Sequence, residues 1–329
     1  MAIVPAAGIG TRLRPQTHTI PKALLNVAGK PILAHILDAL VGQGIERIVV
    51  VTGYKGDRIR EYLAERYREG VEVVEQTQRL GLGHAVQVTA STVGEGPVLI
   101  VLGDTIVEPR WQDFLGGEVA VIGVKEVDDP RRFGVVEVSG ERVVRLVEKP
   151  ADPPSPLAIV GIYYFPEARP LFAALEALIG GERRTKGEYQ LTDALQSMLD
   201  GGAPMRVAPV GGWFDCGKPE TLLSTNRHLL QQVPQPLPIP GVTLLPPVFI
   251  APTAVVEQAV VGPHVSIADG AVVRRAIVRD AIVNEGAVVE EILLDSSVVG
   301  ECAVVRGAFQ RVNVGDYSEV DLSGRPAAE

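Results

Sequence analysis

The sequence predicts an α/β protein in which a Rossmann-like, mostly parallel sheet is followed by a short left-handed parallel β-helix. Two patterns support this prediction. Between residues 3 and 102, apolar runs of strand length alternate with longer amphipathic stretches, as in parallel βαβ units. Beyond residue 248, single aliphatic residues recur every five or six positions, as in a prism built from short parallel strands.

The βαβ pattern predicts a first domain over residues 1–232. Strands and helices are expected in turn at residues 3–7, 32–40, 48–51, 58–67, 71–74 and 98–102. Shorter β-branched runs, separated by Asp-Pro, Ser-Gly and Pro-Pro, then fill residues 119–165 and indicate a mixed region inserted into the parallel sheet. Helical patterns return after this region and end near residue 232. A parallel sheet of this kind is covered by helices on both faces.

A proline-rich segment follows the first domain. Residues 233–247 contain six prolines and almost no charge, so they can neither continue a helix nor pair fully in a sheet, and we expect a stiff linker. The β-helix is expected over residues 248–320, with a tail at 321–329. Its coils should contain 16 or 17 residues, with one inward aliphatic residue on each of three faces. The expected inward residues are Ile250, Val256, Val261, Ile267, Val273, Val278, Val283, Val289, Leu294, Val299 and Val305.

The composition is that of an ordinary globular protein. The 329 residues are 46% hydrophobic and 22% charged, with a formal net charge of −9. Because no basic block stands out, a nucleic-acid polymer is not expected as a partner. The chain runs from Met1 into an apolar strand pattern without signal-peptide features, so we expect a cytoplasmic protein that does not act at a membrane. Cys216 and Cys302 have no Cys or His at metal-ligand spacing, and both are expected to be free, buried thiols.

A glycine loop follows the first predicted strand. It reads Gly8-Ile9-Gly10-Thr11-Arg12-Leu13-Arg14-Pro15. Glycines at the carboxyl end of a strand let backbone N–H groups approach phosphate oxygens closely. A dinucleotide fingerprint would need a third glycine where Leu13 stands, and a P-loop would need Gly-Lys-Ser/Thr after four spacers. Two cations, Arg12 and Lys22, flank the loop instead, which indicates an anion-binding site of another kind.

The glycine loop and the motifs after it resemble the signature of the sugar-1-phosphate nucleotidylyltransferases, and most closely the long form of the glucose-1-phosphate thymidylyltransferases. The further motifs are Pro21-Lys22, Gly29-Lys30-Pro31-Ile32, Gln76, Gly81, Gly103-Asp104, Phe133-Gly134-Val135-Val136, Glu148-Lys149-Pro150, Gly161 and Trp213-Phe214-Asp215-Cys216-Gly217. They cover nearly all of the first domain in the family's order. The predicted β-helix resembles the C-terminal extension of the long form.

The resemblance implies a transferase that joins a nucleoside triphosphate to a hexose 1-phosphate and releases pyrophosphate. In this reaction a sugar-phosphate oxygen attacks the α-phosphorus in line, so the protein must position two polyanions and neutralise developing charge. The resemblance makes Arg12 and Lys22 the catalytic cations, with Arg12 on the leaving β- and γ-phosphates and Lys22 on the α-phosphate. The implied nucleotide-binding residues are Ala7, Gly8, Gly10, Thr11, Gln76 and Gly81, of which the last two read the base.

The resemblance also implies a magnesium site and a sugar-phosphate site. Asp104 follows an apolar strand at the edge where open α/β sheets bind ligands, and it would ligate Mg²⁺ together with Asp215. The implied sugar-phosphate residues are Gly134, Glu148, Lys149 and Gly161. No function is assigned to Glu188, Asp193 or Asn226, for which cap or turn roles compete.

Two questions stay open at this point. Pro5 and the segment Gly81-Leu82-Gly83-His84-Ala85-Val86 look more like glucose-1-phosphate uridylyltransferases, whereas the β-helix and Trp213-Phe214-Asp215 favour dTTP over UTP. Other classes are a non-catalytic regulator that binds sugar nucleotides and a hexapeptide-repeat acyltransferase, for which His264 is the only histidine in the repeats. The flat faces and open end of a β-helix also predict a homo-oligomer.

Overall fold

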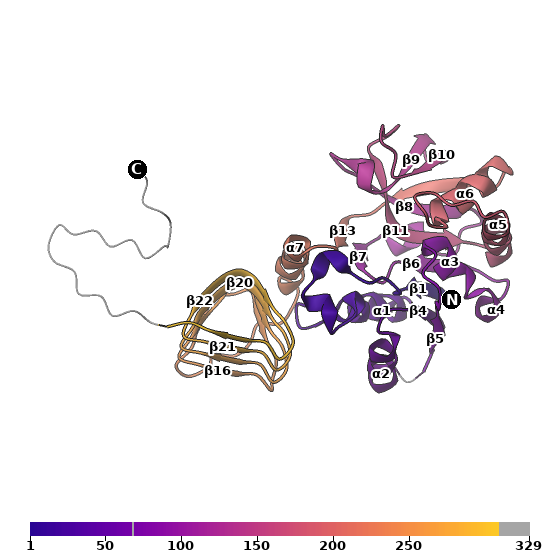
Figure 1. Cartoon of the computed structure of the whole chain (residues 1–329). Coiled ribbons are helices and arrows are strands. Elements are labelled where there is room, and N and C mark those ends of the chain that lie inside the picture. The colour runs from indigo at the N-terminus through magenta and orange to yellow at the C-terminus, as the bar shows by residue number, and fades with distance from the viewer. Residues whose placement is uncertain (68, 309–329) are drawn as a thin grey trace.

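The computed structural model describes residues 1–67 and 69–308 (Figure 1). Within them, the first domain is built on a nine-stranded sheet. Its strands, in spatial order, are β5 (Val71–Glu75), β4 (Ile48–Thr52), β1 (Ala2–Pro5), β6 (Val98–Val101), β11 (Leu157–Phe165), β8 (Ala120–Glu126), β12 (Met205–Pro209), β10 (Arg142–Glu148) and β9 (Gly134–Ser139). Strands β5, β4, β1 and β6 are parallel, while β11 runs antiparallel to both β6 and β8. The predicted mixed region is therefore confirmed.

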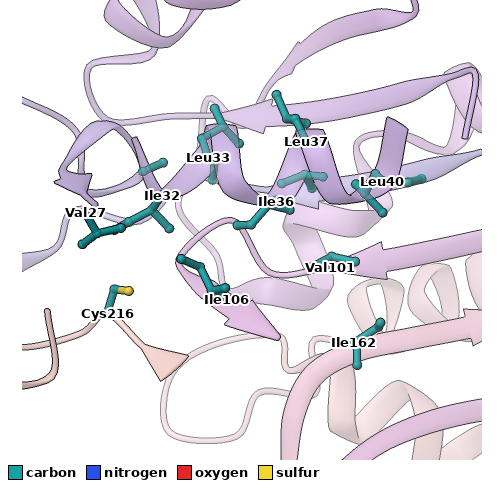
Figure 2. Packing of buried hydrophobic residues seen from close by; sticks show 14 of the residues in the cluster. Val27, Ile32, Leu33, Ile36, Leu37, Leu40, Val101, Ile106, Ile162 and Cys216 are labelled. Carbon is teal, nitrogen blue, oxygen red and sulfur yellow. The ribbon is translucent and has the colours of Figure 1, made fainter. Parts of the chain in front are cut away.

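Helices cover both faces of this sheet, because alternate residues of its strands point to opposite sides. Val4 of β1 belongs to the core cluster under one set of helices, and Ile3 belongs to the cluster under the other. The first set is α1 (Ile32–Gly42), α2 (Gly56–Arg66) and α7 (Pro219–Leu230), and the second is α3 (Leu82–Gln87), α5 (Ala168–Gly180) and α6 (Leu191–Asp200). Figure 2 shows Ile36 of α1 above Val101 and Ile162 of the sheet.

Shorter elements complete the first domain. They are α4 (Ala90–Val93), two two-stranded antiparallel sheets, and 3₁₀ helices at Thr11–Leu13, Gln16–His18, Lys22–Leu24, Trp111–Asp113 and Pro130–Arg132. One pair joins β2 (Asn26–Val27) to β3 (Lys30–Pro31), and the other joins β7 (Thr105–Glu108) to β13 (Gly212–Asp215). The second pair brings together two chain segments that are far apart in the sequence. In the described part of the chain, no helix is both long and apolar enough to cross a membrane.

The C-terminal part is a prism of parallel strands, as expected of a left-handed parallel β-helix. The strands are β14 (Thr243–Leu244), β15 (Val248–Ile250), β16 (Val255–Glu257), β17 (Val260–Val261), β18 (Val265–Ile267), β19 (Val272–Arg274), β20 (Ile277–Val283), β21 (Val288–Glu290), β22 (Leu293–Val299) and β23 (Val304–Arg306). Successive coils pair in register, so that Val248 lies beside Val265 and Val265 beside Ala281. All eleven aliphatic residues predicted to point inward belong to, or pack against, the buried cluster of the prism.

The ends of the prism differ from the sequence-based boundaries in two respects. Thr243 and Leu244, inside the predicted linker, pair with Val260 and Val261, so parallel pairing starts before residue 248. Residues 309–320 of the predicted β-helix and the predicted tail, 321–329, lie outside the described residues. The expectation that both cysteines are buried is wrong for Cys302, which is exposed in the turn between β22 and β23.

The prism is docked on the first domain through α7, which lies between the two in Figure 1. Asn226 of α7 is fully buried. Its side-chain oxygen accepts hydrogen bonds from the backbone N–H of Ala28 (2.8 Å) and from the hydroxyl of Ser266. Its nitrogen donates to the backbone oxygen of His264 (3.2 Å). One amide thus joins the segment after Lys22 to the second coil of the prism.

Candidate functional site

A pocket of about 660 Å³ lies at the carboxyl ends of β1 and β6. Open α/β sheets bind ligands at this edge. The pocket is lined by the glycine loop, by Lys22 and Asp104, and by a segment that contains Gln76 and Gly81. The structure therefore places the predicted nucleotide-binding residues Ala7, Gly8, Gly10, Thr11, Gln76 and Gly81 around one cavity.

The glycine loop leaves β1 at Pro5 and turns sharply at Gly10. Gly10 has a φ of 69°, in the left-handed region that favours glycine, and an added Cβ would lie 3.0 Å from side-chain atoms of Lys22 and Thr17. The Thr17 hydroxyl donates to the backbone oxygen of Gly10 (2.8 Å), which holds the turn. The 3₁₀ turn after it buries Leu13 and leaves Arg12 exposed at the pocket.

The side chain of Lys22 lies close to two carboxylates, those of Asp104 and Asp215. Lys22 is only 6% exposed, and its Nζ lies 2.6 Å from Oδ2 of Asp104 and 3.9 Å from Oδ1 of Asp215. The antiparallel pairing of β13 with β7 sets Asp215 opposite Thr105, the residue after Asp104. Close to this cluster, a Cβ added to Gly217 would lie 2.9 Å from Asp215 and 3.1 Å from Nη2 of Arg12. The site therefore gathers two cations and two carboxylates.

The charges of the cluster stabilise one another. Desolvation at the floor of the pocket tends to raise the pKa of Asp104. The charge and hydrogen bond of Lys22 outweigh this effect, with smaller contributions from Thr105 and Arg12, so the pKa of Asp104 is lowered overall. Asp104 is therefore ionised at neutral pH. Its side chain remains 44% exposed, so one face of the carboxylate is accessible from the pocket.

Three of the four predicted sugar-phosphate residues, Gly134, Glu148 and Lys149, form a second cluster. Glu148 at the end of β10 is paired with Nζ of Lys149 (2.9 Å) and accepts a hydrogen bond from the hydroxyl of Thr192 (2.7 Å). Gly134 lies against them, since an added Cβ would be 3.1 Å from Oε2 of Glu148. Gly161 is placed differently: an added Cβ would lie 2.7 Å from Leu102, next to the Gly103-Asp104 turn. Gly161 thus supports the backbone beneath Asp104.

Some residues at these clusters had no predicted role. Glu188 lines the pocket, and its Cβ lies 2.8 Å from where a Cβ on Gly81 would be. Thr192 holds Glu148, and His84 contacts the amide of Gln76. The sequence could not predict these contacts, because the partners of all three residues come from other strands and loops.

Comparison with known proteins decides the family. A model of the nucleotidyl transferase family matches residues 1–232, a region that includes every predicted site residue. The chain belongs to this family. The predicted resemblance and the prediction of a nucleotidyltransferase enzyme are therefore confirmed.

Several relatives share this region. Agl11, a low-salt glycan biosynthesis nucleotidyltransferase of Haloferax volcanii, is 38% identical over 239 residues, which cover 70% of this chain and 66% of the relative. A glucose-1-phosphate thymidylyltransferase of Streptomyces griseus is 32% identical over 357 aligned positions, covering 98% of this chain and 99% of the relative. The bifunctional protein GlmU of Methanococcus maripaludis is 37% identical over 235 residues, covering 70% of this chain and 55% of the relative. The chain thus spans about two thirds or less of two of these nucleotidyltransferase relatives, and nearly all of the third.

The fold of the first domain also occurs in a solved structure. The crystal structure of UDP-glucose pyrophosphorylase in complex with UDP-glucose superposes with a TM-score of 0.61 at 23% identity. The match covers 70% of this chain and 98% of the other. At this identity the likeness establishes a shared fold and nothing about the substrates of this chain.

Proposed function

We propose that this nucleotidyltransferase joins dTTP to glucose 1-phosphate, with Mg²⁺, and releases pyrophosphate. The observation that carries the proposal is the convergence of Arg12, Lys22, Asp104 and Asp215 beside a glycine loop in one pocket. Such a set can bind a triphosphate and balance the charge that develops as pyrophosphate leaves. The resemblance over nearly the full length to a thymidylyltransferase, prism included, supports dTTP.

The carboxylates of Asp104 and Asp215 fit a magnesium site. Both approach the Lys22 ammonium, so both face the same small space. In the described residues, no group of three or more His, Cys, Asp or Glu side chains could hold a metal. Two carboxylates leave the remaining positions to phosphate oxygens and water, which is the coordination that Mg²⁺ prefers. A bound Mg²⁺ would neutralise phosphate charge and orient the α-phosphate for in-line attack.

The chain's own side chains supply the rest of the mechanism. Lys22, held by two carboxylates, presents a fixed positive charge to the α-phosphate. Arg12 offers a planar, permanently charged fork to the leaving β- and γ-phosphates. Lys149 binds the phosphate of the sugar, while Glu148, oriented by Thr192, accepts hydrogen bonds from sugar hydroxyls. No protein nucleophile is required, because the sugar phosphate itself attacks.

The proposal predicts a base preference. Pyrophosphate release is measured with Mg²⁺ and glucose 1-phosphate, comparing dTTP, UTP, GTP, CTP and ATP. We expect the highest kcat/KM with dTTP, followed by UTP, because a methyl-sized contact discriminates weakly, by about 1–3 kcal/mol. CTP and ATP should be at least about a hundredfold poorer, since a site built to pair with a base N–H rejects bases that lack it.

The other outcomes separate the alternatives. A preference for UTP would favour the alternative function, a glucose-1-phosphate uridylyltransferase, which Pro5 and residues 81–86 resemble. No pyrophosphate release with any triphosphate, across several hexose phosphates, would contradict catalysis and favour a sugar-nucleotide-binding regulator. Acyl transfer from an acyl donor without pyrophosphate release would indicate an acyltransferase.

We also infer that the prism assembles with a second copy of the chain. In-register pairing stacks Val255, Val272, Val288 and Val304 in one row on an outer face. Val304 is 56% exposed and Val255 is 37% exposed, so the row presents apolar surface to solvent. Light scattering at micromolar concentration should give a mass at least twice that of the 35.1 kDa chain. A monomer mass would contradict this inference.

A further inference from the structure

The amide of Gln76 is held rigidly at the edge of the pocket. Gln76 follows β5, and its backbone N–H donates to the oxygen of Thr52 (2.8 Å). The residue is only 5% exposed, yet it lines the pocket. Its side-chain conformation is therefore set by its neighbours, and only the part that reaches the pocket is available to a ligand.

Two neighbours fix which way this amide faces. Nε2 of Gln76 lies 3.0 Å from the backbone oxygen of Gly81 and 3.0 Å from Nδ1 of His84. A backbone oxygen can only accept, so the nitrogen of the amide, not its oxygen, must face Gly81. Its second hydrogen is then available to His84, whose Nδ1 must be unprotonated to accept it. Burial lowers the pKa of His84 below its usual value, which keeps the ring neutral at pH 7.

His84 is itself held in place by the start of α3. The backbone N–H of Gly83 donates to the oxygen of Tyr189 (2.8 Å). Gly81, with a φ of 108°, packs so closely on the same oxygen that an added Cβ would lie 2.7 Å from it. His84 is one residue after Gly83, so these contacts with Tyr189 fix the position of the His84 backbone and thereby of its ring.

Because both hydrogens of Nε2 are engaged, only Oε1 of the Gln76 amide is available to a ligand. Its Oε1 has no hydrogen-bond donor among residues 1–67 and 69–308. The backbone N–H of Gly81 likewise donates to no group in the described parts of the chain. The pocket therefore offers a base one acceptor and one donor. Thymine, uracil and guanine carry a ring N–H next to a carbonyl and match this pair, whereas cytosine and adenine carry a ring acceptor next to an amino group and do not.

We propose that His84 is a positioning residue for base selection: it accepts from Nε2 of Gln76 and so keeps Oε1 of Gln76 turned toward the base. The inference rests on the proposed function, because it assigns Gln76 to the base of the nucleotide. Without an acceptor at this position, Gln76 loses one of the two contacts that prevent its amide from rotating. A rotated amide would present N–H to the pocket and would suit cytosine instead.

The test compares two variants of His84 in the full chain. His84→Leu removes the acceptor, and His84→Asn restores one, because the oxygen of asparagine can occupy the position of Nδ1. For His84→Leu we expect KM for dTTP and UTP to rise about three- to tenfold, the effect of one hydrogen bond, with kcat nearly unchanged. The ratio of kcat/KM for UTP over CTP should fall by a similar factor. His84→Asn should keep both values within about twofold of wild type.

The outcomes distinguish this proposal from the proposed function. A wild-type enzyme that uses dTTP or UTP, with the same UTP-to-CTP ratio in the Leu variant, would overturn the role of His84 and leave the proposed function intact. A wild-type preference for CTP or ATP would overturn both. If His84→Leu does not fold, His84→Phe, which keeps a ring without an acceptor, provides the same comparison with His84→Asn.

Discussion

Replacing Asp104 with asparagine is expected to lower kcat for pyrophosphate release by about 10³-fold, the scale on which loss of one transition-state charge partner is felt. The substitution keeps the shape of the side chain but removes the negative charge that pairs with Lys22 at 2.6 Å and that would help to hold Mg²⁺. Lys22 retains Asp215 at 3.9 Å as a counter-charge, so the melting temperature should change little. The loss should therefore appear in kcat and in the magnesium dependence, and not in the folded fraction.

Asp57→Asn is a matched control for this experiment. Like Asp104, Asp57 is paired with a cation, in this case Arg60, but its side chain is 90% exposed on α2. Removing its charge should leave kcat unchanged, since exposed ion pairs contribute little. If Asp104→Asn turns over at the wild-type rate with the same magnesium requirement, the assignment of Asp104 to the metal is wrong.

Replacing Asn226 with alanine is expected to lower the free energy of unfolding by about 3–5 kcal/mol. The change leaves the N–H of Ala28, the hydroxyl of Ser266 and the backbone oxygen of His264 without their partner in a buried place. Each buried group that loses its hydrogen bond costs about 1–3 kcal/mol. Urea denaturation followed by circular dichroism measures the loss, and KM for the triphosphate should rise as well, because Ala28 follows the segment that carries Lys22.

Asn284→Ala provides the comparison. Asn284 is also buried, at 3% exposure, but within residues 1–67 and 69–308 its side chain makes a single hydrogen bond, from Nδ2 to the backbone oxygen of Val299 in the prism. It should cost about 1 kcal/mol and leave the triphosphate KM unchanged. A loss of stability at Asn226 no larger than that at Asn284 would show that the prism is not joined to the first domain through this amide.

The features that sequence predicts well in this chain are periodic or local. The inward residues of the prism follow from a recurrence of five or six positions, because each coil pairs with the next one 16 or 17 residues later. The glycine loop is local too, since the turn at Gly10 needs a positive φ and close contact with Thr17 and Lys22. The expectation that Cys302 is buried was wrong, because it rested only on the absence of a Cys or His at metal-ligand spacing, which says nothing about burial.

The features that sequence alone could not predict depend on contacts between distant segments. Asp104 and Asp215 meet only because β7 pairs with β13, and only the family resemblance brought them together before the structure did. Asn226 looked like a cap or turn residue, because its partners come from residue 28 on one side and from the prism on the other. His84 lies eight residues after Gln76, but its role depends on how Tyr189 clamps the start of α3.

We propose that Asp104 and Asp215 form the metal site at which the nucleotidyl group is transferred. The most direct test is a crystal grown with Mn²⁺ and dTDP-glucose, in which anomalous scattering locates the metal. We expect Mn²⁺ to be coordinated by both carboxylates and by phosphate oxygens of the nucleotide, next to Lys22. A metal bound elsewhere, with neither carboxylate among its ligands, would contradict it.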